Sequence, residues 1–259
     1  MLRRRELLRK QGRRRLAILL AIVSVIAVVA GYKLLAMSSA FAVTEVDVRG
    51  ANPALARQIH AAVESVAGGR NLLQVDQSAL ASRLQDMPYV RSVSIDRAFP
   101  HTLAVRVVVE HPAVLVMVGK TGYLVSDDGR VLERTAAAPA RLPQVTLTGT
   151  TSLTIGRDSG DDGVRAALAV LASTPPGFGH AVGHITRLIP GQGTITAVVG
   201  DHIRLRLGDT SQLSLKLEVV RRVMRRVQGA QRKELGYIDV TAPNRPAYGM
   251  RSMLTSSTG

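Results

Sequence analysis

The stretch VTEVDVRGANPALARQIHAAVESVAGG, residues 43–69, sets the fold of the region that follows the N-terminal segment. Residues 43–49 alternate apolar and polar side chains, which predicts a half-buried strand that ends at Gly50. Asn52 and Pro53 suit a helix N-cap and its first turn, and the two glycines at the end of the stretch suit a helix stop. We therefore expect a strand followed at once by an amphipathic helix.

The next forty residues complete a small β-α-α-β-β unit. Asp76 is a plausible cap for a second short helix, which Pro88 closes. Two alternating runs, residues 90–97 and 102–110, then predict a pair of strands. The unit ends near residue 111.

Beyond residue 112 the pattern changes to short strands and tight turns, so the fold class is α+β. Asp128-Gly129 favours a hairpin with a primed turn, because glycine tolerates the positive φ that such a turn requires. A long helix at residues 211–228 carries one apolar stripe. We expect the other helix at 161–173, and strands at 114–118, 123–126, 130–133, 144–148, 185–189, 194–199, 203–207, 236–241 and 246–250.

The N-terminal segment combines a basic tail with an apolar run. Residues 1–15 hold eight Lys or Arg residues and one acidic residue, and residues 16–37 are nearly all apolar. About 20 apolar residues in a helix span a bilayer core, and a basic flank stays on the cytoplasmic side. We expect a single transmembrane helix at 16–37, with everything beyond it outside the cytoplasm. The anchor residues singled out are Leu16, Leu20, Val25, Val29 and Tyr32, and the topology residues are Arg13, Arg14 and Arg15.

A cleaved signal peptide is the alternative for this segment. Ser38-Ser39-Ala40 offers a small-residue cleavage site, but the apolar core of a signal peptide usually runs for only about 7–15 residues. The longer run favours an uncleaved anchor. A buried core helix fits poorly, because no face of the run is polar.

Composition disfavours nucleic acid as a partner. The net charge is +15, but nearly half of the excess lies in the basic tail, where topology and anionic lipids account for it. The chain has no Trp, three Phe and five Tyr, so platforms for stacking bases are scarce. The remaining excess is diffuse apart from four arginines of the long helix, which form either a solvated face or a docking surface for an acidic partner or wall polymer: Arg221, Arg222, Arg225 and Arg226.

The sequence shows no constellation of catalytic residues. The absence of cysteine excludes disulfides, thiolate metal sites and a cysteine nucleophile. His180 and His184 lie in a glycine-rich segment where we expect a solvated loop and not a metal-binding helix. Asp127 and Asp128 suit a hairpin better than a carboxylate pair, since neighbouring strand-end residues point to different faces. The chain also lacks a complete GxGxxG, a GxSxG and an SxxK. We expect a binding or scaffold role, with no catalytic residue, cofactor or metal.

A series of short motifs resembles the bacterial division protein family FtsQ, called DivIB in some lineages. Each motif is weak alone, but their order behind an anchor is specific. The first half of the resemblance lies in VDVRG (46–50), GRNLL (69–73), DMPYV (86–90), FPHTL (99–103) and VEHPA (109–113). The second half lies in YLVSDDG (123–129), LG (207–208), KL (216–217) and YIDV (237–240).

The resemblance implies a domain organisation and a role. It implies a POTRA domain at 43–111, an FtsQ-type β-domain at 112–250 and a flexible tail at 251–259. The role would be that of a non-catalytic, single-pass membrane scaffold at the division septum, which links early and late division proteins. Its POTRA domain would contact other division proteins, and its β-domain would bind the FtsB/FtsL (DivIC/FtsL) pair by strand addition.

By position, residues 241–250 correspond to the docking edge of the family. The implied contact residues are Ala242, Asn244, Arg245, Ala247, Tyr248 and Met250. The family's better-studied members have aromatic residues where this chain has Ala242 and Met250, so Tyr248 becomes the candidate aromatic anchor. Pro243 and Pro246 remove two backbone N–H donors from this segment, which limits the hydrogen bonds that an added strand can form. An alternative interpretation is that Pro246 prevents strand pairing at an edge that binds no partner.

Two other functions compete with the scaffold. One is a membrane-anchored cell-wall enzyme. The other is a POTRA-type secretion or assembly factor, although such proteins usually carry several POTRA units or a barrel.

Overall fold

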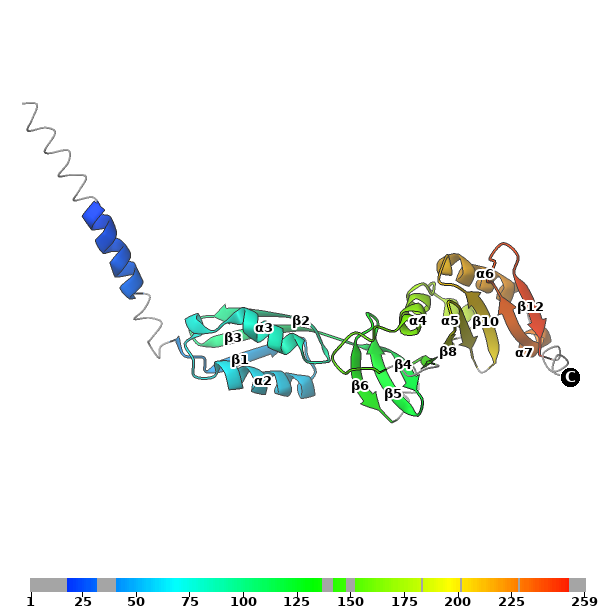
Figure 1. The fold of residues 1–259 in the computed structure, drawn as a ribbon, viewed down its shortest axis with the longest axis horizontal. Helices are drawn as coiled ribbons and strands as arrows, with labels where there is room; N and C mark the ends of the chain where they lie inside the picture. Colours follow the sequence, from blue (N-terminus) through cyan, green and yellow to red (C-terminus); the bar gives the residue numbers. More distant parts are fainter. Residues whose placement is uncertain are drawn as a thin grey trace, which may run out of the picture. The chain divides into compact units, whose positions relative to one another are not determined.

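The computed structural model describes residues 18–31, 41–136, 142–147, 152–182, 184–200, 202–227 and 229–251 (Figure 1). The chain divides into two compact units. Unit 1 consists of Met1–Asp86 and Val90–Val109, and unit 2 of Met87–Tyr89 and Glu110–Gly259.

Residues 18–31 form a helix near the N-terminus. Leu20, Val25 and Val29 lie in this helix with their side chains exposed. The rest of the predicted anchor at 16–37, including Leu16 and Tyr32, lies outside the described residues, as do the three topology arginines. None of the helices in the described ranges combines the length and the apolar character needed to cross a membrane. The transmembrane span stays a prediction.

Unit 1 is a three-stranded sheet with two helices against it. The strand order is β1-β3-β2, with β1 parallel and β2 antiparallel to the central β3. Leu103, Val105 and Val107 of β3 are buried and alternate with more exposed residues, so one face of the sheet forms the core. The elements are β1 (Glu45–Arg49), α2 (Pro53–Ala67), the short 3-10 helix η2 (Leu72–Gln74), α3 (Gln77–Gln85), β2 (Val90–Ala98) and β3 (Thr102–Val109).

Both predicted helix caps of unit 1 are confirmed. The Asn52 side chain accepts a hydrogen bond from the backbone N–H of Leu55 at 2.9 Å. The Asp76 carboxylate accepts bonds from the Ser78 hydroxyl at 2.6 Å and from the N–H groups of Ser78 and Ala79. These bonds lower the pKa of Asp76, with the Ser78 hydroxyl making the largest contribution. Capping residues satisfy N–H groups that the first helical turn leaves unpaired.

Unit 2 is built on one mixed sheet of nine strands, in the order β12-β11-β10-β9-β8-β7-β4-β5-β6. The pairs β4–β7, β7–β8 and β10–β11 are parallel, and the others are antiparallel. The strands are β4 (Pro112–Val118), β5 (Thr121–Ser126), β6 (Val131–Thr135), β7 (Gln144–Leu147), β8 (Ile185–Pro190), β9 (Ile195–Val199), β10 (Ile203–Gly208), β11 (Leu235–Asp239) and β12 (Ala247–Met250). The helices are α4 (Asp162–Ala172), α5 (Phe178–Ala181), α6 (Leu213–Arg226) and α7 (Ala230–Glu234).

One continuous apolar core holds unit 2 together. It joins buried residues of α4 and α6 to the inner face of the sheet, with Phe178, Leu205 and Leu217 among its fully buried side chains. A smaller cluster of Leu115, Leu124 and Leu132 covers the other face of β4, β5 and β6. The predicted stripe of the long helix is confirmed, because Leu213, Leu217, Val220, Met224 and Val227 are all buried.

Two local expectations about secondary structure are wrong, and one short helix is unexpected. The hairpin between β5 and β6 forms, but only Gly129 of its turn has a positive φ, 95°. A type I′ turn needs positive φ at Asp128 as well. This turn is therefore an unprimed turn followed by a glycine in the left-handed conformation. His180 lies in the four-residue helix α5 and not in a loop. Helix α7 lies between the long helix and the strand that follows it, a stretch for which the sequence predicts no helix.

Candidate partner-binding edge

Strand β12 forms one end of the nine-stranded sheet. It pairs antiparallel with β11, with Asp239 opposite Ala247, Ile238 opposite Tyr248 and Tyr237 opposite Gly249. Within the described residues no strand pairs with the other side of β12. The free edge of a terminal strand presents backbone N–H and C=O groups that an added strand can bond. The structure therefore has a strand edge at the C-terminal end of its described sheet.

Two contacts of Arg206 hold side chains of β11 on one face of the sheet, next to β12. The guanidinium carbon of Arg206, in β10, lies 4.7 Å from the centre of the Tyr237 ring in β11. The same arginine lies 3.8 Å from the carboxylate of Asp239. The Tyr237 ring extends over Gly249 of β12, where an added Cβ would fall 2.4 Å from the ring carbon Cε1. Gly249 is needed here because the ring occupies the place of a side chain.

The opposite face of β12 presents an aromatic side chain. Residues directly opposite each other in antiparallel strands share a face, so Tyr248 lies on the side of the fully buried Ile238. Yet 53% of Tyr248 is exposed. An amphipathic ring that is half covered at a sheet edge has apolar surface and a hydroxyl left for a partner.

The sequence-derived contact residues fall into two groups. Ala247, Tyr248 and Met250 lie in β12, whereas Ala242, Asn244 and Arg245 lie in the loop that precedes it. The backbone N–H of Arg245 donates to the carbonyl of Ala242 at 3.0 Å, which closes a turn with a proline at its second position. Pro243 and Pro246 both lie in this loop, so β12 itself contains no proline. The strand is shorter than predicted but uninterrupted.

Helix α7 connects this edge to the body of unit 2, and its role escaped sequence reasoning. The backbone N–H of Arg251, directly after β12, donates to the carbonyl of Glu234 at 2.7 Å. Arg232 of α7 donates to the carbonyls of Ala181 and Val182, at 2.9 and 3.2 Å. The sequence feature that could have predicted α7 is a run of helix-forming residues, AQRKE, between a glycine and a strand.

The arginine face of α6 is partly neutralised by one acidic residue. Glu218 lies 2.8 Å from Arg221, 3.7 Å from Arg222 and 4.0 Å from Arg225. Arg226 is exposed on the same helix. One carboxylate shared by three guanidinium groups leaves this surface basic.

A buried lysine fixes the start of α6. The Lys216 side chain is 2% exposed, and its ammonium group donates to the carboxylate of Asp209 at 2.7 Å and to the Asp209 backbone carbonyl at 2.9 Å. Bonds from Lys216 and Ser211 lower the pKa of Asp209 to about 2. The pair has a structural role, because it joins the end of β10 to the first turn of α6.

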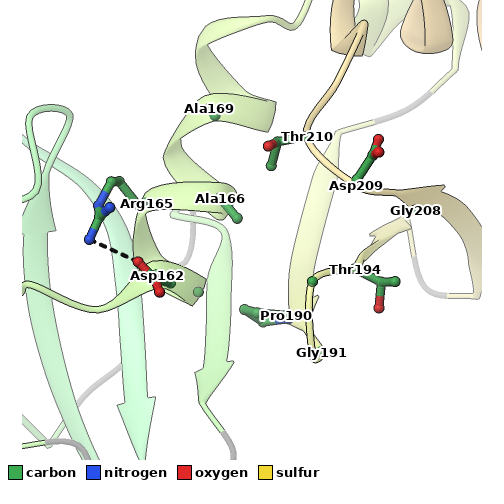
Figure 2. A pocket seen from close by; sticks show the side chains of 12 residues that line it. Asp162, Arg165, Ala166, Ala169, Pro190, Gly191, Thr194, Gly208, Asp209 and Thr210 are labelled. Carbon is green, nitrogen blue, oxygen red and sulfur yellow. Dashed lines mark ion pairs between the residues drawn. The ribbon is translucent and has the colours of Figure 1, made fainter.

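The same segment borders a hollow of about 400 Å³ between α4, the β8–β9 turn and the β10–α6 loop (Figure 2). Arg165 and Asp162 form an ion pair at its rim, 2.9 Å apart. Small residues make up much of the lining, including Gly163, Ala166 and Gly191. The described residues that line it include no histidine that could act as a base for its threonine hydroxyls.

The sequence predicts that Asp127 and Asp128, in the β5–β6 turn, point to different faces, but their carboxylates lie close together. Carboxylate oxygens of Asp127, Asp128 and buried Glu110 all lie within 4.8 Å of one another. The two aspartates lie in a turn, where the alternation of strand side chains does not apply. Three neighbouring acidic groups do not by themselves define a metal site. His180 and His184 are exposed, and neither belongs to a group of potential ligands in the described part of the chain.

Comparison with known proteins finds a matching family model for each of the two units. Residues 41–111 match the family model "POTRA domain, FtsQ-type", and residues 114–241 match "Cell division protein FtsQ/DivIB, C-terminal". The cell division protein FtsQ of Streptomyces collinus is 29% identical over 92% of this chain and 90% of its own length. FtsQ of Streptomyces griseus is 29% identical over 74% of this chain and 90% of its own. FtsQ of Mycolicibacterium smegmatis is 30% identical over 76% of this chain and 56% of its own.

A solved structure of the major extracytoplasmic domain of DivIB from Geobacillus stearothermophilus matches 46% of this chain and 98% of its own, at 17% identity and a TM-score of 0.31. Proteins of the FtsQ/DivIB family are membrane-associated division scaffolds with an extracytoplasmic domain and are not known enzymes. With an FtsQ-type POTRA domain and an FtsQ/DivIB C-terminal domain following each other in one chain, this protein belongs to the FtsQ/DivIB family of cell division proteins.

Proposed function

We propose that this protein is a single-pass scaffold of the bacterial divisome that binds an FtsB/FtsL-like pair through β12. In this proposal residues 16–37 anchor the chain, residues 1–15 lie in the cytoplasm, and the domains at 43–111 and 112–250 lie outside it at the septum. The POTRA domain contacts other division proteins. Residues 251–259 form a tail beyond the binding edge.

The observation that carries the proposal is the position of β12 at the end of the sheet. A partner segment that adds as a tenth strand obtains backbone hydrogen bonds along β12, and alternate side chains provide selectivity. The edge is short, since β12 has four residues. Backbone bonds alone therefore give limited affinity, and side-chain contacts have to supply the rest.

Tyr248 is the side chain best placed to supply that contact. Aromatic residues dominate binding energy in many interfaces, where they fill pockets and lose water. Tyr248 is half exposed beside the buried Ile238, and Arg245 is exposed in the adjoining turn. We assign Tyr248 as the aromatic anchor of the edge and Arg245 as a polar contact at its rim.

The test is co-purification from membranes of full-length variants with a co-expressed FtsB/FtsL pair. Tyr248→Glu puts a charge on the proposed contact surface. Ile155→Glu is the matched control, because Ile155 is an apolar residue of unit 2 with similar exposure, 48%, and lies outside β11 and β12. We expect Tyr248→Glu to lose at least about tenfold in affinity, while Ile155→Glu binds like the parent.

Hydrogen exchange at the backbone of β12 supplies a second measurement. Partner binding should slow the exchange of β12 amides in the parent, because an added strand bonds those that face outward. Full binding by Tyr248→Glu, or unchanged exchange in β12 when the partner is bound, would show that the edge is not the docking site. Equal loss of binding in both variants would also contradict it.

A further inference from the structure

Two of the three phenylalanines of the chain stack on each other at one end of unit 1. The rings of Phe41 and Phe99 lie edge to face, with their centres 6.0 Å apart and their planes at 86°. Phe99 is 57% exposed, whereas the third phenylalanine, Phe178, is 1% exposed in the core of unit 2. The chain has no tryptophan. Phe41 is only partly buried beneath the Phe99 ring. In a chain with so few large aromatic residues, the exposed Phe99 ring with Phe41 against it is a distinct apolar surface.

Backbone hydrogen bonds fix where this pair lies in unit 1. The carbonyl of His101 accepts bonds from the N–H groups of Thr44 and Glu45, at 3.1 and 3.4 Å. This ties the β2–β3 turn, which carries Phe99, to the segment that begins with Phe41. On its other side that segment is bonded to Arg70, whose carbonyl accepts from Val43 at 2.9 Å. The aromatic pair is therefore held where the chain enters the domain.

The length of the connecting chain limits how far this end lies from the proposed anchor. The apolar run ends at Met37, four residues before Phe41. Four residues span at most about 14 Å when fully extended. The headgroup layer outside the hydrocarbon core is about 5–8 Å thick on each side. Phe41, and with it Phe99, is thus confined to the vicinity of the bilayer surface.

We propose that Phe41 and Phe99 form a lipid-binding contact that rests this end of unit 1 on the outer surface of the bilayer. The proposal depends on the membrane anchor of the proposed function. Aromatic and apolar side chains insert at the boundary between headgroups and acyl chains, and positive charge adds attraction to anionic lipids. Arg70 supplies such a charge, since it is exposed and its backbone carbonyl is bonded to Val43 of the segment that begins with Phe41. The contact restricts the tilt of the POTRA domain relative to the bilayer.

The test places a reporter at the proposed contact. The full-length protein is reconstituted in phosphatidylcholine/phosphatidylglycerol vesicles, with and without brominated acyl chains near the headgroups. Phe99→Trp introduces the only tryptophan of the chain and keeps an aromatic ring at this position. Val108→Trp is the control, since Val108 is 54% exposed in the same domain, about 20 Å along β3 from the turn.

Brominated lipid should reduce the fluorescence of Phe99→Trp by roughly half or more and leave that of Val108→Trp nearly unchanged, because only the first tryptophan reaches the lipid. Alkaline carbonate washing of the same vesicles shows whether the protein is anchored. Retention in the vesicles without quenching at position 99, or with equal quenching at both positions, overturns the lipid contact alone. Release by the wash overturns both the anchor and the contact that depends on it.

Discussion

Replacement of Gly249 by alanine should destabilise the C-terminal edge of the sheet, against the usual trend for strands. Alanine is normally favoured over glycine in a strand by about 0.5–1 kcal/mol, because glycine loses more backbone entropy. Here the new Cβ would lie 2.4 Å from Cε1 and 2.9 Å from Cζ of Tyr237. Ordinary carbon contacts lie at about 3.5–4.0 Å. The overlap has to be relieved by movement of β12 or of the ring.

Either movement lowers the unfolding free energy, and the contacts in the structure limit by how much. Overpacking in a well-packed core costs about 1–3 kcal/mol. The cost here lies at the lower end of that range, because the atoms in the way belong to the far end of the partly exposed Tyr237 side chain. If the ring moves instead, it leaves the guanidinium of Arg206, 4.7 Å from its centre, a contact worth about 0.5–1 kcal/mol at an exposed site. We expect Gly249→Ala to lower the unfolding free energy of unit 2 by about 1 kcal/mol.

The assay is urea denaturation of the full chain in detergent, with hydrogen exchange in β11 and β12 to locate the effect. In a Tyr237→Ala background the obstacle is gone, so Gly249→Ala should there be neutral or slightly stabilising. The double-mutant cycle isolates this coupling. A stabilising Gly249→Ala in the parent, or an equal penalty in both backgrounds, would refute the assigned contact.

Three further predictions concern stability. Asp209 has its pKa lowered to about 2, chiefly by Lys216, so its contribution to stability is present above the unfolded pKa near 3.8 and lost as the pH falls toward 2. Asp209→Asn should therefore weaken the acid dependence of unfolding between pH 4 and 2; an unchanged profile would contradict this. Asn52→Ala removes the α2 cap and should cost about 1 kcal/mol in urea denaturation, whereas Asn52→Asp should retain most of the stability. Leu205→Ala should cost about 2–5 kcal/mol because Leu205 is fully buried, and a loss below 1 kcal/mol would show that its site collapses.

Several parts of the fold could be predicted because their signals are local. The caps at Asn52 and Asp76, the apolar stripe of α6 and the alternation in β3 each involve residues a few positions apart. Such short-range patterns report which side chains face a core and where a helix begins. They also reveal the order of elements that resembles a known family.

The turn types and short helices were harder to predict. At the β5–β6 turn the Asp-Gly pair indicates a hairpin, but which residues adopt positive φ depends on the register of the two strands. Helix α7 has five residues, and a helix this short is not stable without tertiary contacts such as those of Arg232.

By itself the sequence determined the two-part α+β organisation, most element positions, and a basic tail followed by an apolar run. The family resemblance implied a docking edge at residues 241–250, but only the tertiary structure decided that β12 pairs with β11 there, that Tyr248 stays half exposed, and that Gly249 makes room for Tyr237. It likewise brought together Phe41 and Phe99, which lie 58 positions apart in the chain. The physical reason is that strand order and stacking depend on pairing between distant segments, whereas periodicity and capping record only the interactions of near neighbours.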